Sequence, residues 1–211
     1  MGKLLLLFLL LGAGAALASM VSSRSGEAPA QRASAASTAA AVFAGGCFWC
    51  TESDFDHIPG VISTTSGYSG GRTANPTYRQ VSAGGTGHIE AVRIVYDPAK
   101  VSYQTLVARF FRTVDPLDSG GQFCDRGYQY RTAIFVADAA QRRVAEATKA
   151  RAAALLRKPV ATLILPAARF YPAEGYHQDY YKKNPIRYKY YRWRCGREAR
   201  LAQIWGKSAG H

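Results

Sequence analysis

Two consecutive glycines, Gly45 and Gly46, separate a short apolar run from an amphipathic segment, and this junction constrains the fold more than any other feature of the chain. The apolar run, residues 40–44, has the length and composition of a buried strand. Paired glycines are typical of a tight turn. The amphipathic segment after them begins at Cys47. The sequence therefore predicts a strand, a tight turn and a helix, with Cys47 at the helix N-terminus.

Cys47 is a candidate nucleophile because of this position. The free N–H groups and the positive dipole end of a helix N-terminus favour a thiolate over a thiol. A cysteine that only fills space in a core would fit the same position. Cys50 follows at the C-x-x-C spacing of thioredoxin-like redox motifs, so a redox-active dithiol is a further interpretation.

The first 38 residues carry targeting and linker signals. Residues 1–18 combine a basic start, a Leu-rich apolar run and an Ala-Leu-Ala cleavage motif, the pattern of a secretory signal peptide. The apolar run is shorter than the ~20 residues that span a bilayer, so membrane contact is expected only through an uncleaved N-terminus. Residues 19–38 are rich in Ala, Ser and Pro and predict a flexible linker. We therefore expect an exported, periplasmic protein with one globular domain, residues 39–211.

The domain is strongly basic towards its C-terminus. The chain of 211 residues has a formal net charge of +13, and aromatic residues stand between the late basic ones. This mixture is typical of nucleic-acid binding, but an exported protein seldom meets nucleic acid. The sequence therefore favours a solvated basic face and no nucleic-acid partner. The basic residues are Lys182, Lys183, Arg187, Lys189, Arg192, Arg194, Arg197 and Arg200.

Hydrophobic periodicity predicts an α+β fold. The order of signals is strand, helix, strand, strand, helix, strand, helix, strand, and Ser102 and Asp138 are the expected N-caps of the second and third helices. Two adjacent strands in the middle favour a two-layer sandwich on a split βαβ (ferredoxin-like) core. Beyond Pro185 we expect a long coiled C-terminal tail with a short final helix. The predicted strands are 40–44, 61–65, 88–96, 132–136 and 161–165, and the helices that follow the Cys47 helix are 102–114, 139–156 and 197–205.

The segment Gly46-Cys47-Phe48-Trp49 is the first of several blocks that resemble, in the same order, the motifs of the peptide methionine sulfoxide reductases of the MsrA type. The resemblance covers roughly residues 41–185. It implies the same fold class and an enzyme of oxidative damage repair that reduces the S epimer of methionine sulfoxide, in proteins or as the free amino acid. We expect no metal and no cofactor. The other blocks include Gly67-Tyr68-Ser69-Gly70-Gly71, Asn75-Pro76-Thr77-Tyr78, Gly87-His88-Ile89-Glu90-Ala91-Val92, Asp125-Arg126-Gly127-Tyr128-Gln129-Tyr130-Arg131 and Tyr176-His177-Gln178-Asp179-Tyr180.

Reduction of a sulfoxide needs a nucleophile, an acid and hydrogen-bond donors for the oxygen. The resemblance implies Cys47 as the nucleophile and Glu90 as the catalytic acid. Alternation along the predicted strand places Glu90 on the same face as Val92 and Ile94. Apolar burial beside Phe48 and Trp49 would penalise the carboxylate and keep Glu90 protonated near neutral pH. Without the resemblance, an exposed strand carboxylate is the alternative.

Five further residues match the substrate-binding positions of the family. Tyr78 and Tyr130 match the tyrosines that hold the sulfoxide oxygen, since a phenol donates a hydrogen bond while it stays neutral. Phe48 and Trp49 match the pocket for the S-methyl group, where aromatic rings contact sulfur and carbon favourably. Asp125 matches an acidic residue that helps to shape the site. The alternatives are half-buried core tyrosines and a carboxylate that caps a turn.

A second thiol must condense with the sulfenic acid that the reaction leaves on the nucleophile. The resemblance points to a cysteine of the C-terminal tail, Cys195, as this resolving thiol. Cys50 and Cys124 are alternatives, and many relatives have Gly and Asn at these two positions. Reopening of the resulting disulfide implies a thioredoxin or thioredoxin-like dithiol protein as reductant. The other expected partners are oxidised proteins that carry methionine sulfoxide.

Two other classes of protein compete with this interpretation. A disulfide oxidoreductase would use Cys47 and Cys50 alone, and would need neither Glu90 nor an aromatic pocket. A zinc module would take those two cysteines with Cys124 and Cys195 as ligands. One C-x-x-C with two isolated cysteines lacks the paired spacing of common zinc sites, which counts against the module.

Overall fold

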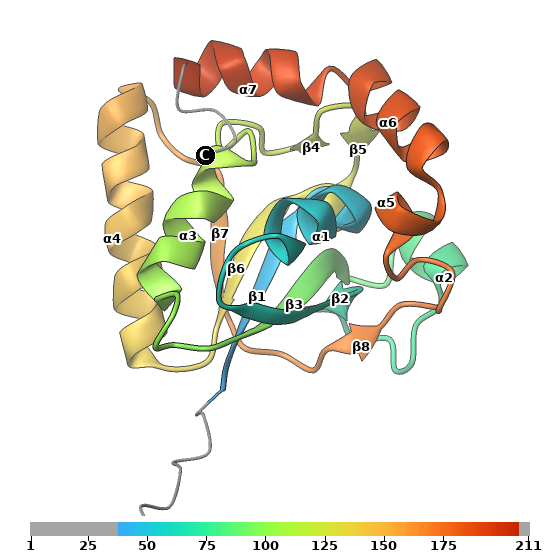
Figure 1. Cartoon of the computed structure of the whole chain (residues 1–211). Helices are drawn as coiled ribbons and strands as arrows, with labels where there is room; N and C mark the ends of the chain where they lie inside the picture. The colour runs from blue at the N-terminus through green and yellow to red at the C-terminus, as the bar shows by residue number, and fades with distance from the viewer. Residues whose placement is uncertain (1–37, 207–211) are drawn as a thin grey trace, which may run out of the picture. The chain divides into compact units, whose positions relative to one another are not determined.

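The computed structural model describes residues 38–206, and a six-stranded sheet forms its centre (Figure 1). The strand order across the sheet is β7-β6-β1-β3-β2-β8. The predicted signal peptide, and the predicted linker up to residue 37, lie outside the described residues. The strands are β1 (Ala39–Gly45), β2 (Val61–Ser69), β3 (Ile89–Tyr96), β6 (Thr132–Val136), β7 (Leu163–Pro166) and β8 (Tyr171–Pro172).

The two central strands determine where the Gly-Gly turn lies. β3 pairs antiparallel with β1 on one side and with β2 on the other, whereas β6 and β7 are parallel. Phe43 lies opposite Val92, and Tyr68 lies opposite Glu90. The C-terminal end of β1 is therefore beside the N-terminal end of β3. This pairing brings the start of the following helix, at Cys47, to the same end of the sheet as Glu90.

Seven α-helices lie within residues 38–206, and none of them is long and apolar enough to cross a membrane. A short hairpin of β4 (Gly121–Gln122) and β5 (Asp125–Arg126) leads into a 3-10 turn, Tyr128–Tyr130. Figure 1 shows this hairpin near α6 and α7, far from it in sequence. The helices are α1 (Phe48–Asp56), α2 (Tyr78–Ser82), α3 (Tyr103–Arg112), α4 (Ala139–Leu156), α5 (Tyr180–Lys183), α6 (Pro185–Arg194) and α7 (Arg197–Trp205).

The main hydrophobic core lies between the sheet and the helices α1 and α3. The ring of Phe43 on β1 lies 5.5 Å from the ring of Phe55 on α1 and 5.3 Å from that of Phe110 on α3, measured between centroids. All three side chains are fully buried. Complete burial of a phenylalanine contributes roughly 1.5–3 kcal/mol, so these contacts fix α1 firmly against the sheet.

Alternation along β3 assigns its residues to the two faces as the sequence predicts. Val92 and Ile94 belong to the main core, whereas Ile89 and Ala91 belong to a smaller cluster on the other face. Glu90 therefore points to the helix-covered face, where it is 1% exposed. The alternative of an exposed strand carboxylate is wrong.

Local sequence signals locate two of the long helices correctly. α4 has its predicted bounds, and Asp138 caps it by accepting a hydrogen bond from the N–H of Gln141 at 2.8 Å. Ser102 caps α3 by accepting from the N–H of Thr105 at 3.0 Å. The predicted mixture of a sheet core with packed helices is confirmed.

The C-terminal segment differs from the predicted coil. The helix α7 has its predicted bounds, but two further helices, α5 and α6, precede it. Pro185 stands at the first helical position of α6, where its missing N–H costs no intrahelical bond. Tyr188 is buried on the inner face of α6. The expectation of a coiled tail is therefore wrong for residues 185–194, because their helix depends on packing against the domain.

Candidate active site

The Gly-Gly turn places Cys47 at the start of α1, as the sequence predicts. Cys47 is the N-cap residue of the helix. Gly46 has φ +84, and a Cβ atom there would lie 2.5 Å from Cβ of Gln122. Both the left-handed conformation and the close contact require glycine at this position. The side chain of Cys47 is 7% exposed.

Cys47 opens into a cavity of about 70 Å³. A water molecule occupies about 30 Å³ in the liquid, so the cavity admits a group of a few heavy atoms. Apart from Cys195, every site residue implied by the family resemblance lines it, and Tyr191 joins them. The lining residues are Cys47, Phe48, Trp49, Tyr78, Glu90, Asp125, Tyr130 and Tyr191.

Glu90 has the environment of a protonated acid. Burial raises the pKa of its carboxyl to about 8, and the nearby Asp125 adds to the rise. The N–H of Phe48 donates a hydrogen bond to Oε2 of Glu90 at 3.0 Å, which opposes the rise without cancelling it. Glu90 therefore holds a proton near neutral pH and presents it beside Cys47.

The two phenols of the cavity stay neutral. Burial raises the pKa of Tyr78 to about 12 and moves the pKa of Tyr130 upwards as well. The N–H of Tyr78 donates to Oε1 of Glu174 at 2.8 Å, and the hydroxyl of Tyr68 donates to Oε2 of the same carboxylate at 2.9 Å. Glu174 thereby fixes the start of α2, and with it the position of Tyr78. Both tyrosines are available as hydrogen-bond donors.

Trp49 forms one wall of the cavity and is held on two sides. Its indole Nε1–H donates to Nδ1 of His177 at 2.9 Å, and its ring stacks on Tyr180 at 3.7 Å between centroids. Burial lowers the pKa of His177, so the ring is neutral and Nδ1 can accept. The ring of Phe48 lies 5.0 Å from the same histidine. His177 is therefore a structural hydrogen-bonding residue that positions the Trp49 ring.

Tyr191 is a site residue that the sequence analysis missed. Its hydroxyl donates to Oδ2 of Asp125, and its ring meets the ring of Trp49 edge-on at 5.8 Å. Burial raises the pKa of Tyr191 far above its ordinary value, and it raises the pKa of Asp125 as well. The sequence signal is the run of aromatic and basic residues in α6, a run whose composition as a whole predicts a solvated face.

Cys47 and Cys50 form a buried, free thiol pair. Burial raises the pKa of Cys47 well above its ordinary value, and a hydrogen bond to Cys50 adds to the rise. The same hydrogen bond lowers the pKa of Cys50, and the charges of Arg197 and Arg192 lower it further. Within the pair, Cys50 is therefore the thiol that loses its proton more easily. This order is opposite to the prediction that the helix N-terminus makes Cys47 the thiolate.

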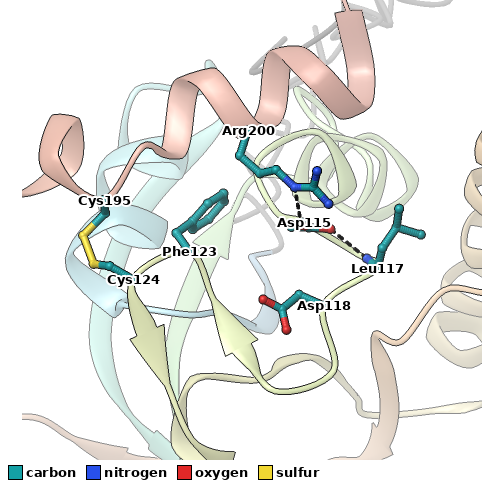
Figure 2. Close-up of a pocket in the computed structure, with 7 residues that line it drawn as sticks. All are labelled: Asp115, Leu117, Asp118, Phe123, Cys124, Cys195 and Arg200. Atoms are coloured by element: carbon teal, nitrogen blue, oxygen red, sulfur yellow. Dashed lines mark hydrogen bonds and ion pairs between the residues drawn. A yellow bond between two sulfur atoms is a disulfide. The ribbon is translucent and has the colours of Figure 1, made fainter.

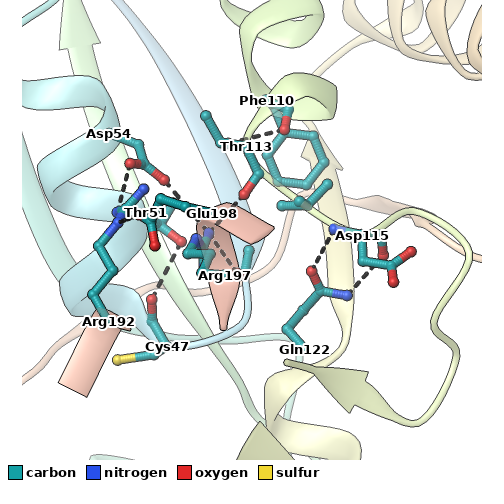
Figure 3. A network of polar contacts seen from close by, with 12 residues as sticks. Cys47, Thr51, Asp54, Phe110, Thr113, Asp115, Gln122, Arg192, Arg197 and Glu198 are labelled. Carbon is teal, nitrogen blue, oxygen red and sulfur yellow. Dashed lines mark hydrogen bonds and ion pairs between the residues drawn. The ribbon is translucent and has the colours of Figure 1, made fainter. Parts of the chain in front are cut away.

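The two arginines reach α1 from the C-terminal helices (Figure 3). Asp54 lies one turn after Cys50 on α1. Nη1 of Arg192 lies 2.7 Å from Oδ1 of Asp54, and Nη2 of Arg197 lies 3.4 Å from Oδ2. Nη2 of Arg197 also donates to the carbonyl of Thr113 at 2.7 Å. Because Arg197 is only 2% exposed, these contacts place a buried positive charge beside the thiol pair.

Cys195 does not line the cavity of Cys47. It forms a disulfide with Cys124, which joins the hairpin of β4 and β5 to the junction of α6 and α7 (Figure 2). A zinc module with four cysteine ligands is incompatible with this bond, since two of the four thiols are consumed. Within residues 38–206 no cluster of three or more His, Cys, Asp or Glu side chains has the arrangement of a metal site.

The comparisons with known proteins agree with one another. The family model described as peptide methionine sulfoxide reductase matches residues 39–209. The peptide methionine sulfoxide reductase MsrA 2 of Rhizobium meliloti is 54% identical over 169 residues, which is 80% of this chain and 84% of the relative. The MsrA 2 of Caulobacter vibrioides is 55% identical over 170 residues, 80% of this chain and 86% of the relative.

Solved structures show the same similarity. Methionine sulfoxide reductase A of Corynebacterium diphtheriae superposes with a TM-score of 0.64 at 36% identity, over 74% of this chain and 78% of that one. Mxr1 of Saccharomyces cerevisiae in reduced form has a TM-score of 0.67 at 30% identity, over 72% and 89% of the two chains. The chain belongs to the peptide methionine sulfoxide reductases of the MsrA type, and it is an enzyme that reduces methionine sulfoxide.

Proposed function

We propose that this enzyme reduces the S epimer of methionine sulfoxide, in oxidised proteins or as the free amino acid, by thiolate attack from Cys47. The observation that carries the proposal is the shared cavity. Cys47 and the protonated Glu90 line the same small space as the phenols of Tyr78 and Tyr130. The cavity thus supplies a nucleophile, an acid and two donors for the oxygen, which are the components that the reaction requires.

The reaction transfers one oxygen atom from the sulfoxide to the sulfur of Cys47. The proton of Cys47 passes to Cys50, its hydrogen-bond partner, and the Cys47 thiolate attacks the sulfoxide sulfur. Glu90 donates a proton to the sulfoxide oxygen. The attack forms a bond between Sγ of Cys47 and the substrate sulfur. The protonated oxygen then moves to Sγ of Cys47 as this sulfur–sulfur bond and the original sulfur–oxygen bond break, so methionine leaves and Cys47 carries a sulfenic acid. Phe48 and Trp49 give the S-methyl group an apolar, aromatic wall.

The enzyme should turn over the S epimer and leave the R epimer essentially untouched. One cavity fixes the methyl wall, the oxygen donors and the sulfur of Cys47, so only one arrangement of substituents around the sulfoxide sulfur fits. The measurement is methionine release from each purified epimer with dithiothreitol as reductant. Comparable rates on the two epimers would contradict the proposed geometry.

Cys50 is the thiol in position to resolve the sulfenic acid. It lies three residues after Cys47 at the start of α1, and both thiols are free and buried. Condensation of the Cys50 thiol with the sulfenic acid forms a Cys47–Cys50 disulfide and releases water. Cys195, the thiol first expected in this role, is held by Cys124. We assign Cys195 to a later exchange with the reductant.

Cys50→Ser should release one equivalent of methionine and then stall, because sulfoxide reduction precedes condensation. The sulfenic acid should persist on Cys47 and be trapped by dimedone. Cys195→Ser, the matched control, should still form the Cys47–Cys50 disulfide in a single turnover. Peptide mapping after one turnover distinguishes the cases. Persistent sulfenic acid in Cys195→Ser, with normal condensation in Cys50→Ser, would restore Cys195 as the resolving thiol.

The remaining proposals concern the cellular setting. A thioredoxin-like dithiol protein would reopen the disulfide, because the cycle needs two electrons for each methionine released. Residues 1–18 would direct export, and the periplasm would be the site of action. Fractionation of cells that express the tagged full chain, with N-terminal sequencing of the product, tests both export and cleavage after residue 18.

A further inference from the structure

The outer face of α6 carries an exposed apolar stripe. Ile186, Tyr190 and Trp193 are 85%, 61% and 72% exposed, and their spacing of four and three residues puts them on one face of the helix. The rings of Tyr190 and Trp193 lie 6.0 Å apart. Large apolar side chains grouped in this way on the surface of a domain mark an interaction surface. These three residues are called the α6 stripe below.

The α6 stripe ends at a disulfide. Cys195 lies two residues after Trp193 and is bonded to Cys124, whose side chain is exposed. The disulfide borders a cavity of about 570 Å³ (Figure 2). A protein thiol that approaches this surface can therefore reach the bond. Besides the two cysteines, the cavity is lined by Asp115, Leu117, Asp118, Phe123 and Arg200.

The catalytic thiols are much less accessible. Cys47 and Cys50 are 7% and 2% exposed, and the cavity of Cys47 has a volume of only about 70 Å³. A cysteine on a folded reductant protein brings its neighbouring backbone with it and does not fit such a space. The surface disulfide, not the buried pair, is the bond that a protein dithiol meets first.

Positive charge surrounds the α6 stripe. Arg187, Lys189 and Arg194 are exposed, and none of them forms an ion pair within the described part of the chain, residues 38–206. Arg192 on the inner side of the same helix is, by contrast, paired with Asp54. Unpaired cations around an apolar centre complement a partner with acidic residues around an apolar patch.

We propose that the α6 stripe is the docking surface for an acidic dithiol protein of the thioredoxin-like class, and that this donor reduces the Cys124–Cys195 disulfide. The inference rests on the proposed function, since it names where the reductant of that cycle binds. The stripe provides the apolar contact, the flanking cations orient the donor, and the disulfide at the end of the helix receives the electrons.

The exchange balances in two steps. A thiolate of the donor attacks one sulfur of the Cys124–Cys195 bond, which forms a mixed disulfide and releases the other sulfur as a thiolate. The second donor thiol then attacks the mixed disulfide, so the donor leaves oxidised and both cysteines are reduced, with two electrons transferred. The same exchange, directed from this pair to a Cys47–Cys50 disulfide, restores the two catalytic thiols and re-forms the surface bond.

The kinetic test replaces Trp193 by Ala in the full-length enzyme and compares two reductants. With bacterial thioredoxin as the probe, the KM for thioredoxin should rise roughly tenfold or more, as truncation of a central aromatic residue does at protein interfaces. With dithiothreitol, which needs no docking surface, the rate should stay unchanged. Leu155→Ala is the matched control, because Leu155 is 67% exposed on α4. Leu155→Ala should change neither the KM for thioredoxin nor the rate with dithiothreitol.

The outcomes separate this inference from the proposed function. If the wild type does not reduce methionine sulfoxide with dithiothreitol, the proposed function itself is refuted. An unchanged KM for thioredoxin in Trp193→Ala would overturn only the docking surface. If Trp193→Ala has an unchanged KM for thioredoxin but binds phosphatidylglycerol vesicles more weakly than the wild type does, the α6 stripe is a membrane-binding surface instead. Lys189→Glu should also raise the KM for thioredoxin, and more so at low ionic strength.

A trapping experiment tests the site of attack in the wild-type enzyme. A thioredoxin whose second active-site cysteine is replaced by serine cannot complete the exchange and remains as a mixed disulfide. Peptide mapping should find it on Cys124 or Cys195. A mixed disulfide with Cys47 or Cys50 alone would show that the donor reaches the buried pair directly and would overturn the proposal.

Discussion

Cys47→Ser should abolish the reduction of methionine sulfoxide. A serine hydroxyl provides almost no anion near neutral pH, and it cannot take up the sulfoxide oxygen as a sulfenic acid. The other free thiol, Cys50, is absent from the lining of the cavity, so it does not replace the missing sulfur. The measurement is a single-turnover assay with excess enzyme and the S epimer, and we expect no methionine above the uncatalysed level.

The control for this experiment is Cys50→Ser, which removes the neighbouring thiol and keeps the nucleophile. It should release close to one equivalent of methionine, more slowly than the wild type because the proton acceptor of Cys47 is gone, whereas Cys47→Ser releases none. Both substitutions exchange sulfur for oxygen in buried positions, so a loss confined to Cys47→Ser cannot be a general packing effect. One equivalent of methionine from Cys47→Ser would assign the attack to Cys50 and refute the proposed nucleophile.

Much of the catalytic framework is predictable because its signals are local. The Gly-Gly turn requires glycine for reasons that one residue and its neighbours determine, and it places Cys47 at the start of α1. Alternation along β3 groups Glu90 with Val92 and Ile94, and the fold covers the face that they share. Asp138 marks the start of α4 by a bond to a residue three positions away. Each of these inferences needs only a few consecutive residues.

The features that the sequence analysis missed depend on contacts between distant segments. Tyr191 enters the cavity through its bond to Asp125, 66 residues earlier. The charge order of the thiol pair depends on Arg192, which reaches Asp54 across 138 residues. The partner of Cys195 is Cys124, across 71 residues. A helix dipole can be predicted from sequence, but the burial and the hydrogen bond to Cys50 that raise the pKa of Cys47 appear only in the folded chain.

The Glu90 carboxyl should also govern the alkaline side of the pH profile. Its pKa is raised to about 8, so the group is protonated below this pH and loses its proton as the pH rises through it. Since the proposed mechanism needs the protonated form, the single-turnover rate of the wild type should fall above pH 8. Deprotonation of the Cys47 thiol, which the attack requires, acts on the rate in the opposite sense.

Glu90→Gln should lower the single-turnover rate about a hundredfold or more, the usual contribution of a general acid. The amide keeps the shape of the side chain but has no acidic proton, so substrate affinity should change little while the chemical step slows. The decrease in rate above pH 8 should disappear as well, because the group that titrates there is gone.

Tyr78→Phe is the control for this substitution. It removes one donor to the oxygen and leaves Glu90 in place, so its rate should fall while the decrease above pH 8 remains. An unchanged rate in Glu90→Gln would remove Glu90 from the mechanism. If Glu90→Gln is slow but still loses rate above pH 8, another group titrates in place of Glu90. Asp125, whose pKa is also raised by burial, would be such a group.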